Sequence, residues 1–167
     1  SLTLENLLNI YDNEISKNVK NKSKLYKFEL HKIEYLLDIR DKLLNGNYDG
    51  GKYNLFLITK PKLRLIMSQN IYDKIINHYV TRYILEPNLS KYLLKNNAAT
   101  RKGMGTSYAI KMLKKFLEKN KIHDDIFVLK FDLSKYFYSI NHDILKRLLR
   151  KDLSKEEYLL VEKIIDS

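Results

Sequence analysis

The most informative segment of this chain is Val128-Leu129-Lys130-Phe131-Asp132-Leu133-Ser134-Lys135-Tyr136-Phe137-Tyr138-Ser139-Ile140. Residues 126–131, which lead into it, form the most strand-like run of the sequence. Asp132 stands where that run ends. A carboxylate at the exit of a buried strand is well placed to hold a cation, but aspartates in such places also cap turns or face solvent. Asp132 alone does not decide between these interpretations.

The composition favours one compact unit that binds a polyanion. The 167 residues are 44% hydrophobic, which is enough to bury a core within the usual size of one domain. There are 31 Lys and Arg against 20 Asp and Glu, giving a formal charge of +11 and a pI of about 9.6. Nucleic acid is the expected partner of such a charge.

Several classes of protein are disfavoured. No apolar run approaches the roughly 20 residues that span a bilayer, so no membrane partner is expected. The N-terminus lacks the basic and apolar regions of a secretory signal, which makes a cytoplasmic location the default. The chain has no cysteine and therefore no disulfide or thiolate metal site. The HExxH spacing of zinc enzymes is not found among its histidines, which are His31, His78, His123 and His142.

Two helices are expected before the first clear break in the sequence. Apolar residues recur at helical spacing over residues 4–16 and again over 23–44. Residues 45–51 then concentrate asparagine, aspartate and glycine, which favour turns.

A β-hairpin is expected at residues 53–67. Its two β-prone runs are joined by Lys60-Pro61-Lys62, where the proline opposes helix and the lysines make the tip cationic. Arg64 stands between Leu63 and Leu65, so strand alternation puts its side chain on the opposite face from theirs.

The next helix, over residues 70–85, is expected to end before Pro87, because proline disfavours helical backbone at the residue before it. A loop over residues 96–106 follows. Its Gly103-Met104-Gly105 precedes a helix and can cradle a phosphate, although such glycines more often form a turn.

Three further helices are expected toward the C-terminus. The first spans residues 107–119 and has an inward-facing set made of Ile110, Leu113 and Leu117. Asn141 begins the second, which runs to about Arg150. Ser154-Lys155-Glu156-Glu157 is a capping box for the third, which runs through Ile165.

Four blocks in a fixed order resemble the motifs of reverse transcriptases. The segment from 128 to 140, with an aromatic residue five positions beyond its aspartate, is similar to the first palm motif of that family. Upstream, residues 56–66 resemble the fingers motif, 72–78 its helical continuation and 101–106 the next glycine-containing block. The joint order and spacing carry the resemblance. The most similar types are the bacterial enzymes of group II introns, retrons and diversity-generating elements.

The resemblance implies a fold and a division of the chain. The fold would be α+β and predominantly helical, with reverse-transcriptase fingers, a β-hairpin and the first palm strand. Residues 1–48 would form an N-terminal helical segment, 49–125 the fingers, and 126–167 the start of the palm. The chain would stop before the rest of the palm and the thumb.

The resemblance also implies a chemistry. An RNA-directed DNA polymerase adds deoxynucleotides to a primer 3′-hydroxyl on an RNA template by two-metal phosphoryl transfer. Asp132 would bind both Mg²⁺ ions, for which Mn²⁺ can substitute, and the backbone carbonyl of Leu133 would bind one. Phe137 corresponds to the aromatic residue that crowds a ribose 2′-hydroxyl. The alternative role for Phe137 is packing in the core. Tyr136 or Tyr138 is the other candidate for that packing role.

Cations elsewhere match residues of the family that bind the substrates. Arg64 corresponds to an arginine that contacts the triphosphate, and Lys62 or Lys60 to its lysine partner. A solvated hairpin would have the same composition. The residues assigned to the template or primer backbone are Arg101, Lys102, Gly103 and Gly105. A surface position without a ligand accounts for Arg101 and Lys102 equally well.

One departure from the family limits what the chain can do alone. Catalysis needs a Tyr-x-Asp-Asp hairpin well after the first aspartate, and none follows Ser139. The one Asp-Asp pair, Asp124-Asp125, precedes Asp132 and is expected to be a polar turn. The isolated chain is therefore expected to be inactive, and polymerase activity would belong to the full-length protein.

Two other functions stay open. One is a non-catalytic RNA-binding module of the maturase kind, and the other is a phage-defence protein on the same fold. The expected partners of the polymerase are an RNA template, a DNA or RNA primer, deoxynucleoside triphosphates, and its own intron or non-coding RNA.

Overall fold

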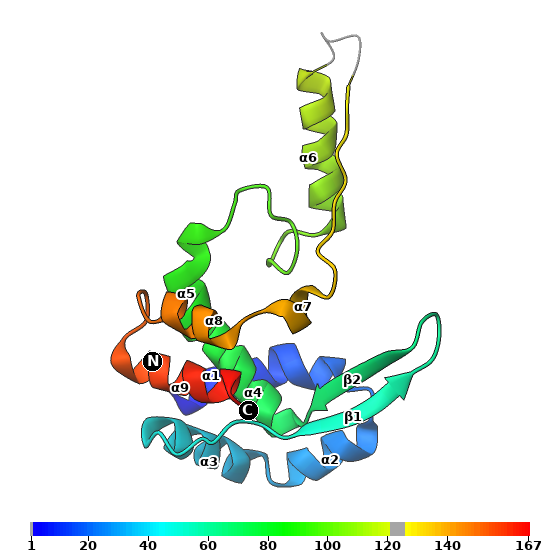
Figure 1. Cartoon of the computed structure of the whole chain (residues 1–167). Helices are drawn as coiled ribbons and strands as arrows, with labels where there is room; N and C mark the ends of the chain where they lie inside the picture. Colours follow the sequence, from blue (N-terminus) through cyan, green and yellow to red (C-terminus); the bar gives the residue numbers. More distant parts are fainter. Residues whose placement is uncertain (1, 121–125) are drawn as a thin grey trace. The chain divides into compact units, whose positions relative to one another are not determined.

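The computed structural model describes residues 2–120 and 126–167, and its elements are labelled in Figure 1. His123 and the Asp124-Asp125 pair lie outside the described residues. The described residues are mostly helical and include a two-stranded antiparallel sheet, which confirms the α+β, predominantly helical class. The chain forms two compact units, Ser1–Leu89 with Asn141–Ser167 and Ser90–Ile140, where one was expected from composition. The assignment of fingers and palm segments stays a prediction.

The first unit begins with helices that pack around aromatic residues. Helix α1, Leu4–Ile10, is capped by Thr3 and continues into a π-helical turn, Tyr11–Ile15. The helix expected over residues 23–44 is divided in two, α2 at Lys22–Leu30 and α3 at Lys32–Leu44. His31 separates them with φ −121° and ψ 20°. The bend lets Phe28 stack on Tyr11 and Tyr35, at centroid distances of 5.0 and 5.1 Å.

The hairpin forms as the sequence predicted. Strands β1, Tyr53–Ile58, and β2, Arg64–Gln69, pair antiparallel, from Tyr53 opposite Gln69 to Ile58 opposite Arg64. The expected turn region before it is also present after Leu44, and Gly46 adopts a left-handed φ of 65° there.

Helix α4, Ile71–Val80, is the centre of the first unit's core. Asn70 caps it, because its side chain accepts a hydrogen bond from the backbone N–H of Asp73. Its apolar face buries Ile75 and Ile76 completely. The other buried apolar residues of this core are Leu7, Ile10, Tyr11, Ile15, Phe28, Leu36, Ile39, Tyr48, Ile71, Tyr79, Val80, Ile84, Leu149 and Val161.

The helical path does not end before Pro87, contrary to expectation. A π-helical turn, Thr81–Leu85, follows α4, and α5, Glu86–Leu89, passes through the proline. A 3-10 turn, Ser90–Tyr92, comes next. Proline has no N–H to donate, but in the first turn of a helical segment that donor is not needed. The π-helical turn ends at Leu85, so Pro87 lies in the first turn of α5 and the chain stays helical there.

The C-terminal helices complete the first unit and match their sequence signals. Helix α8, His142–Leu149, is capped by Asn141, and α9, Lys155–Ile165, by Ser154. Both halves of the Ser154–Glu157 capping box are made. Among the described residues, no helix is both long and apolar enough to cross a bilayer.

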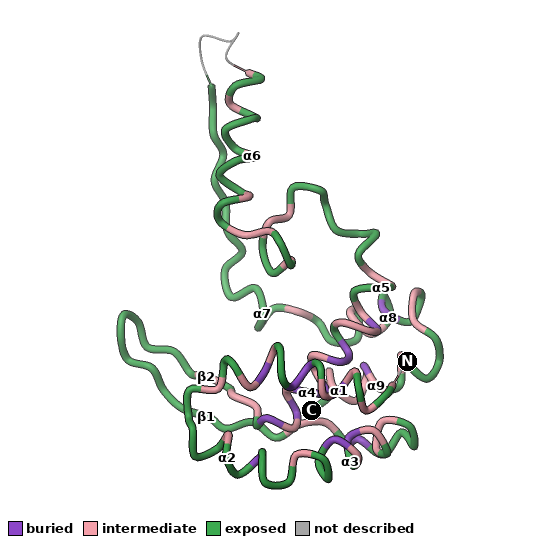
Figure 2. The backbone as a smooth tube through the Cα atoms, turned by 180° about the vertical axis from the view of Figure 1, so that it is seen from behind, coloured by how far each residue is buried: buried purple, intermediate pink, exposed green. Residues whose placement is uncertain are grey.

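The second unit has no buried residue in its described part, as the colouring of Figure 2 shows. Helix α6, Thr106–Lys119, follows the expected loop, and an extended segment runs beside it in both views (Figure 1, Figure 2). A four-residue helix, α7 at Tyr136–Ser139, follows that segment.

Two expectations for this unit are wrong. Residues 126–131 form no strand, and their side chains are exposed, Phe127 to 93%. The inward-facing set of α6 also meets no core, since Ile110 and Leu113 are at least half exposed. A strand needs a neighbouring strand for its N–H and C=O groups, and an amphipathic helix needs a partner surface. In the described part of this unit, no strand pairs with residues 126–131, and the extended segment beside α6 leaves Ile110 and Leu113 exposed.

The three tyrosines with the largest upward pKa shifts make the first unit sensitive to alkaline pH. Burial raises the pKa of each above its ordinary value of 10.0, and a carboxylate that accepts the hydroxyl's hydrogen bond raises it further. The pairs are Tyr11 with Glu29, Tyr48 with Asp73 and Tyr72 with Asp38. Because the folded pKa is the higher one, their stabilisation is complete below about pH 10 and is lost as the pH rises through the folded pKa.

We therefore expect the urea midpoint of unfolding to fall between about pH 8 and about pH 11. Tyr72→Phe removes one of the titrating groups, so the fall should be smaller in that variant. Tyr26→Phe is the control, because Tyr26 is 66% exposed, and its fall should equal that of the unaltered chain. A fall that is identical in all three proteins would contradict this account. The midpoints can be followed by far-UV circular dichroism.

Candidate functional site

The residues assigned to a site from the sequence belong to both units. Lys60, Lys62 and Arg64 lie on the hairpin of the first unit. The second unit holds the remaining ones, which are Arg101, Lys102, Gly103, Gly105, Asp132, Leu133 and Phe137. Each group is described within its own unit.

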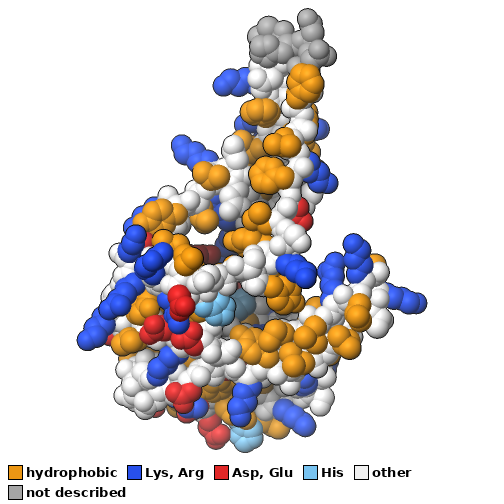
Figure 3. All heavy atoms as spheres, viewed as in Figure 1, with side chains coloured by type: hydrophobic (Ala, Val, Ile, Leu, Met, Phe, Trp, Pro, Cys, Tyr) orange, Lys and Arg blue, Asp and Glu red, His pale blue; other side chains and the backbone are white. Residues whose placement is uncertain are grey.

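The hairpin carries exposed cations at its tip. Lys60, Lys62 and Arg64 are all exposed, and Figure 3 shows Lys and Arg side chains gathered at the end of the hairpin beyond an apolar surface. Within the described residues none of the three forms an ion pair. Their donors are therefore available to an anion such as a triphosphate.

A buried carboxylate holds the base of this hairpin. Asp73, in the first turn of α4, is only 5% exposed. It accepts hydrogen bonds from the Tyr48 hydroxyl at 3.0 Å and from the backbone N–H of Lys52 at 3.1 Å. Gly51 fits closely, because a Cβ there would lie 2.9 Å from the Asp73 carboxyl carbon. Asp73 thereby fixes the residues that lead into β1.

Asp132 lies on the extended segment of the second unit. Its side chain is exposed, and it makes no ion pair or hydrogen bond with any described residue. Lys135, three residues later, has a left-handed φ of 51° and turns the chain into α7. Within the described part of the chain, the carboxylate is therefore not a turn cap.

The oxygen atoms at Asp132 and Leu133 are of the chemical type that Mg²⁺ prefers as ligands. The Asp132 carboxylate and the Leu133 carbonyl are hard oxygen ligands, and Mg²⁺ sites use one or two carboxylates together with water and substrate phosphates. The described residues gather no group of three or more His, Cys, Asp or Glu side chains that could hold a metal ion. A metal ion bound at Asp132 would therefore need further ligands from other groups.

The aromatic residues after Asp132 lie at the surface. Phe137 is 81% exposed, and its ring meets that of Tyr136 edge-on at 5.3 Å. Tyr138 is 82% exposed. Core packing, the alternative role for these rings, is therefore not observed within the described residues.

The glycine-containing loop before α6 is organised by its own arginine. Nη1 of Arg101 donates to the carbonyl of Leu94 at 3.2 Å and more weakly to that of Asn97 at 3.5 Å. Lys102 is exposed and unpaired among the described residues. Gly103 and Gly105 have φ of 75° and 143°, a region that other residues rarely adopt. The loop conformation thus requires glycines, and contact with a phosphate backbone stays a prediction.

Sequence reasoning gave no role to Asp73 or to the lysines of α2 and α4. Asp73 looks like an ordinary first-turn acid, and only the fold shows that it is buried against Tyr48. The available signal for the lysines of α2 was the density of lysine between residues 17 and 32.

No protein-family model matches this chain, and no curated protein matches its sequence.

Proposed function

We propose that this chain supplies the fingers and the first palm segment of an RNA-directed DNA polymerase. The observation that carries the proposal is the ordered set of four blocks, the last of which contains Asp132, whose exposed carboxylate has no partner among the described residues. The exposed, unpaired cations of the hairpin add support, because a polymerase must hold a triphosphate.

In this proposal each residue has one task. Asp132 and the carbonyl of Leu133 hold Mg²⁺, which supplies electrostatic stabilisation of the attacking and leaving oxygens. Arg64 binds the triphosphate through its guanidinium fork, and Lys62 or Lys60 adds a point charge. Phe137 limits the space beside the sugar, which selects deoxynucleotides. The primer, the RNA template and the remaining metal ligands meet these residues in the full-length protein.

The contribution of Arg64 is testable in the full-length protein. Arg64→Gln should raise the KM for deoxynucleoside triphosphate by about 10- to 150-fold, because hydrogen bonds to charged groups contribute roughly 1.5–3 kcal/mol. The turnover number should change little, since the contact is made in both ground and transition states. Steady-state primer extension at varied nucleotide concentration measures both constants.

Lys52→Gln provides a matched control for this test. Lys52 is an exposed cation at the base of the same hairpin, and its side chain has no ion pair among the described residues. Its KM should stay within a factor of two of the unaltered enzyme. An unchanged KM in Arg64→Gln would remove Arg64 from the nucleotide site.

A further inference from the structure

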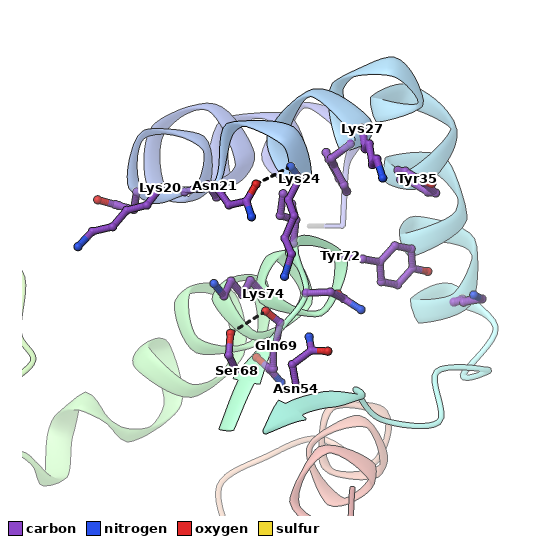
Figure 4. Close-up of a pocket in the computed structure, with 16 residues that line it drawn as sticks. Lys20, Asn21, Lys24, Lys27, Tyr35, Asn54, Ser68, Gln69, Tyr72 and Lys74 are labelled. Atoms are coloured by element: carbon purple, nitrogen blue, oxygen red, sulfur yellow. Dashed lines mark hydrogen bonds between the residues drawn. The ribbon is translucent and has the colours of Figure 1, made fainter. Parts of the chain in front are cut away.

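A cavity of about 780 Å³ opens between α2, the start of α4 and the base of the hairpin, all in the first unit (Figure 4). Among the described residues, no aspartate or glutamate lines it. Its lysines are Lys20, Lys24, Lys27, Lys42 and Lys74, and we call it the lysine groove. Its volume lies within the roughly 300–1,000 Å³ range of ligand pockets.

The charge of the lysine groove is largely uncompensated. Lys42 is paired, because its Nζ lies 2.9 Å from Asp38. The other four lysines have no ion-pair partner in the described part of the chain. The nearby Asp38 is further engaged by the Tyr72 hydroxyl at 2.6 Å. Like charges gathered on low-dielectric walls raise the local concentration of anions.

The arrangement of the lysines fits a linear polyanion better than a single anion. Lys24 and Lys27 are one turn apart on α2, and Lys20 comes just before the helix. At a rise of 1.5 Å per residue, Lys24 and Lys27 lie about 4.5 Å apart along the axis of α2, and Lys20 extends the row before the helix begins. Lys74 lies across the groove on α4, and Figure 4 shows Lys24 reaching from α2 toward that side.

Other groups of the groove favour the same ligand. Two helices of nine and ten residues, α2 and α4, begin at its edge and add the positive ends of their dipoles. Asn54, Ser68 and Gln69 provide hydrogen-bonding groups at the hairpin base. Tyr35, which is 37% exposed, adds an aromatic wall. Lysines beside aromatic rings are the usual composition of grooves for single nucleic-acid strands.

The groove is continuous with one face of the hairpin. Ser68 is paired with Asn54 in the sheet, and both line the groove. Arg64 lies four residues before Ser68 on β2, so strand alternation puts the two side chains on the same face. A single nucleic-acid strand bound in the groove therefore has a path along the hairpin toward Arg64.

We propose that the lysine groove binds the phosphodiester backbone of a single nucleic-acid strand. This binding needs neither Asp132 nor a metal ion, so it does not rest on the proposed polymerase activity. The binding assay also contains no nucleotide or extension step. Failure of one proposal is thus distinguishable from failure of the other.

The test measures binding of a fluorescently labelled single-stranded RNA of 12 nucleotides to the 167-residue chain by anisotropy at several salt concentrations. Each phosphate contact to a single strand contributes about −0.7 to the slope of log affinity against log salt. Lys24→Gln with Lys27→Gln should therefore reduce the slope by about 1.4. Between about 50 and about 200 mM salt, the unaltered chain should lose about sevenfold more affinity than the variant.

Lys151→Gln with Lys155→Gln is the matched control, because both lysines are exposed and unpaired among the described residues of the same unit. The control should keep the slope of the unaltered chain, and an equal reduction in both variants would overturn the proposal.

Single-stranded DNA should show the same change as RNA if phosphates alone are bound, and a change with RNA only would add a contact to the 2′-hydroxyl. A groove variant that lost affinity for phosphatidylserine vesicles but not for oligonucleotides would assign the groove to a lipid surface and overturn the proposal.

Discussion

Replacing Asp73 with alanine should lower the free energy of unfolding of the first unit by about 3 kcal/mol. The carboxylate is 5% exposed and is the acceptor for both the Tyr48 hydroxyl and the Lys52 backbone N–H. Tyr48 is itself only 4% exposed, so water cannot readily replace the lost acceptor. Each buried donor left without a partner costs about 1–3 kcal/mol. Urea unfolding followed by far-UV circular dichroism measures the change.

Two further variants separate this effect from a simple loss of charge. Asp73→Asn keeps the shape and one carbonyl acceptor, so its loss should be about half as large. Asp49→Ala removes an acid that is 94% exposed in its side chain, and should change stability by less than about 0.5 kcal/mol. Equal stability of Asp73→Ala and Asp49→Ala would show that Asp73 does not hold the hairpin base.

The elements that the sequence predicted well are those with local signals. The hairpin at residues 53–67 has two β-prone runs and a proline between them, and its strands end within two residues of the expected positions. Ser154 and Glu157 form their capping box within four residues of chain. Such signals depend on neighbours in sequence, so no knowledge of tertiary contacts is needed.

Elements that depend on distant partners were not predictable in this way. The apolar run at residues 126–131 has the composition of a strand, but strand formation also requires a hydrogen-bonded neighbour. Within the described residues no neighbour pairs with it. The same reason applies to α6, which has no buried residue in the described part of its unit. Composition shows that a segment can form a strand, but a hydrogen-bonded neighbour decides whether the strand forms.

The candidate functional residues also divide into those that a sequence motif reveals and those that only the fold brings together. Asp132 and Arg64 were found because a motif surrounds each of them in sequence. Lys24 and Lys74 were not, because they come together only when α2 packs beside the start of α4 and the hairpin base. Asp73 likewise meets Tyr48 from 25 positions away in the chain.

Asp132→Asn in the full-length protein should reduce primer extension by at least about 1,000-fold. A metal ligand stabilises charge in the transition state by several kcal/mol, and each 1.36 kcal/mol corresponds to a factor of ten in rate. Asparagine has nearly the shape of aspartate but lacks the negative charge that binds the cation. Because Asp132 is exposed and unpaired among the described residues, the substitution should leave the fold unchanged.

Glu118→Gln is the matched control for this variant. Glu118 is an exposed carboxylate on α6, in the same unit as Asp132, and it has no ion pair among the described residues. Its removal changes the net charge by the same amount. Extension by this control should remain within about a factor of two of the unaltered protein.

The most direct measurement compares two losses in the full-length Asp132→Asn protein: extension of a primer on an RNA template with Mg²⁺, and affinity for that template. If Asp132 is a metal ligand of a polymerase, extension should fall by about 1,000-fold or more while template affinity stays within about threefold. Undiminished extension, or an equal loss of extension and affinity, would contradict the assignment of Asp132 as a catalytic metal ligand.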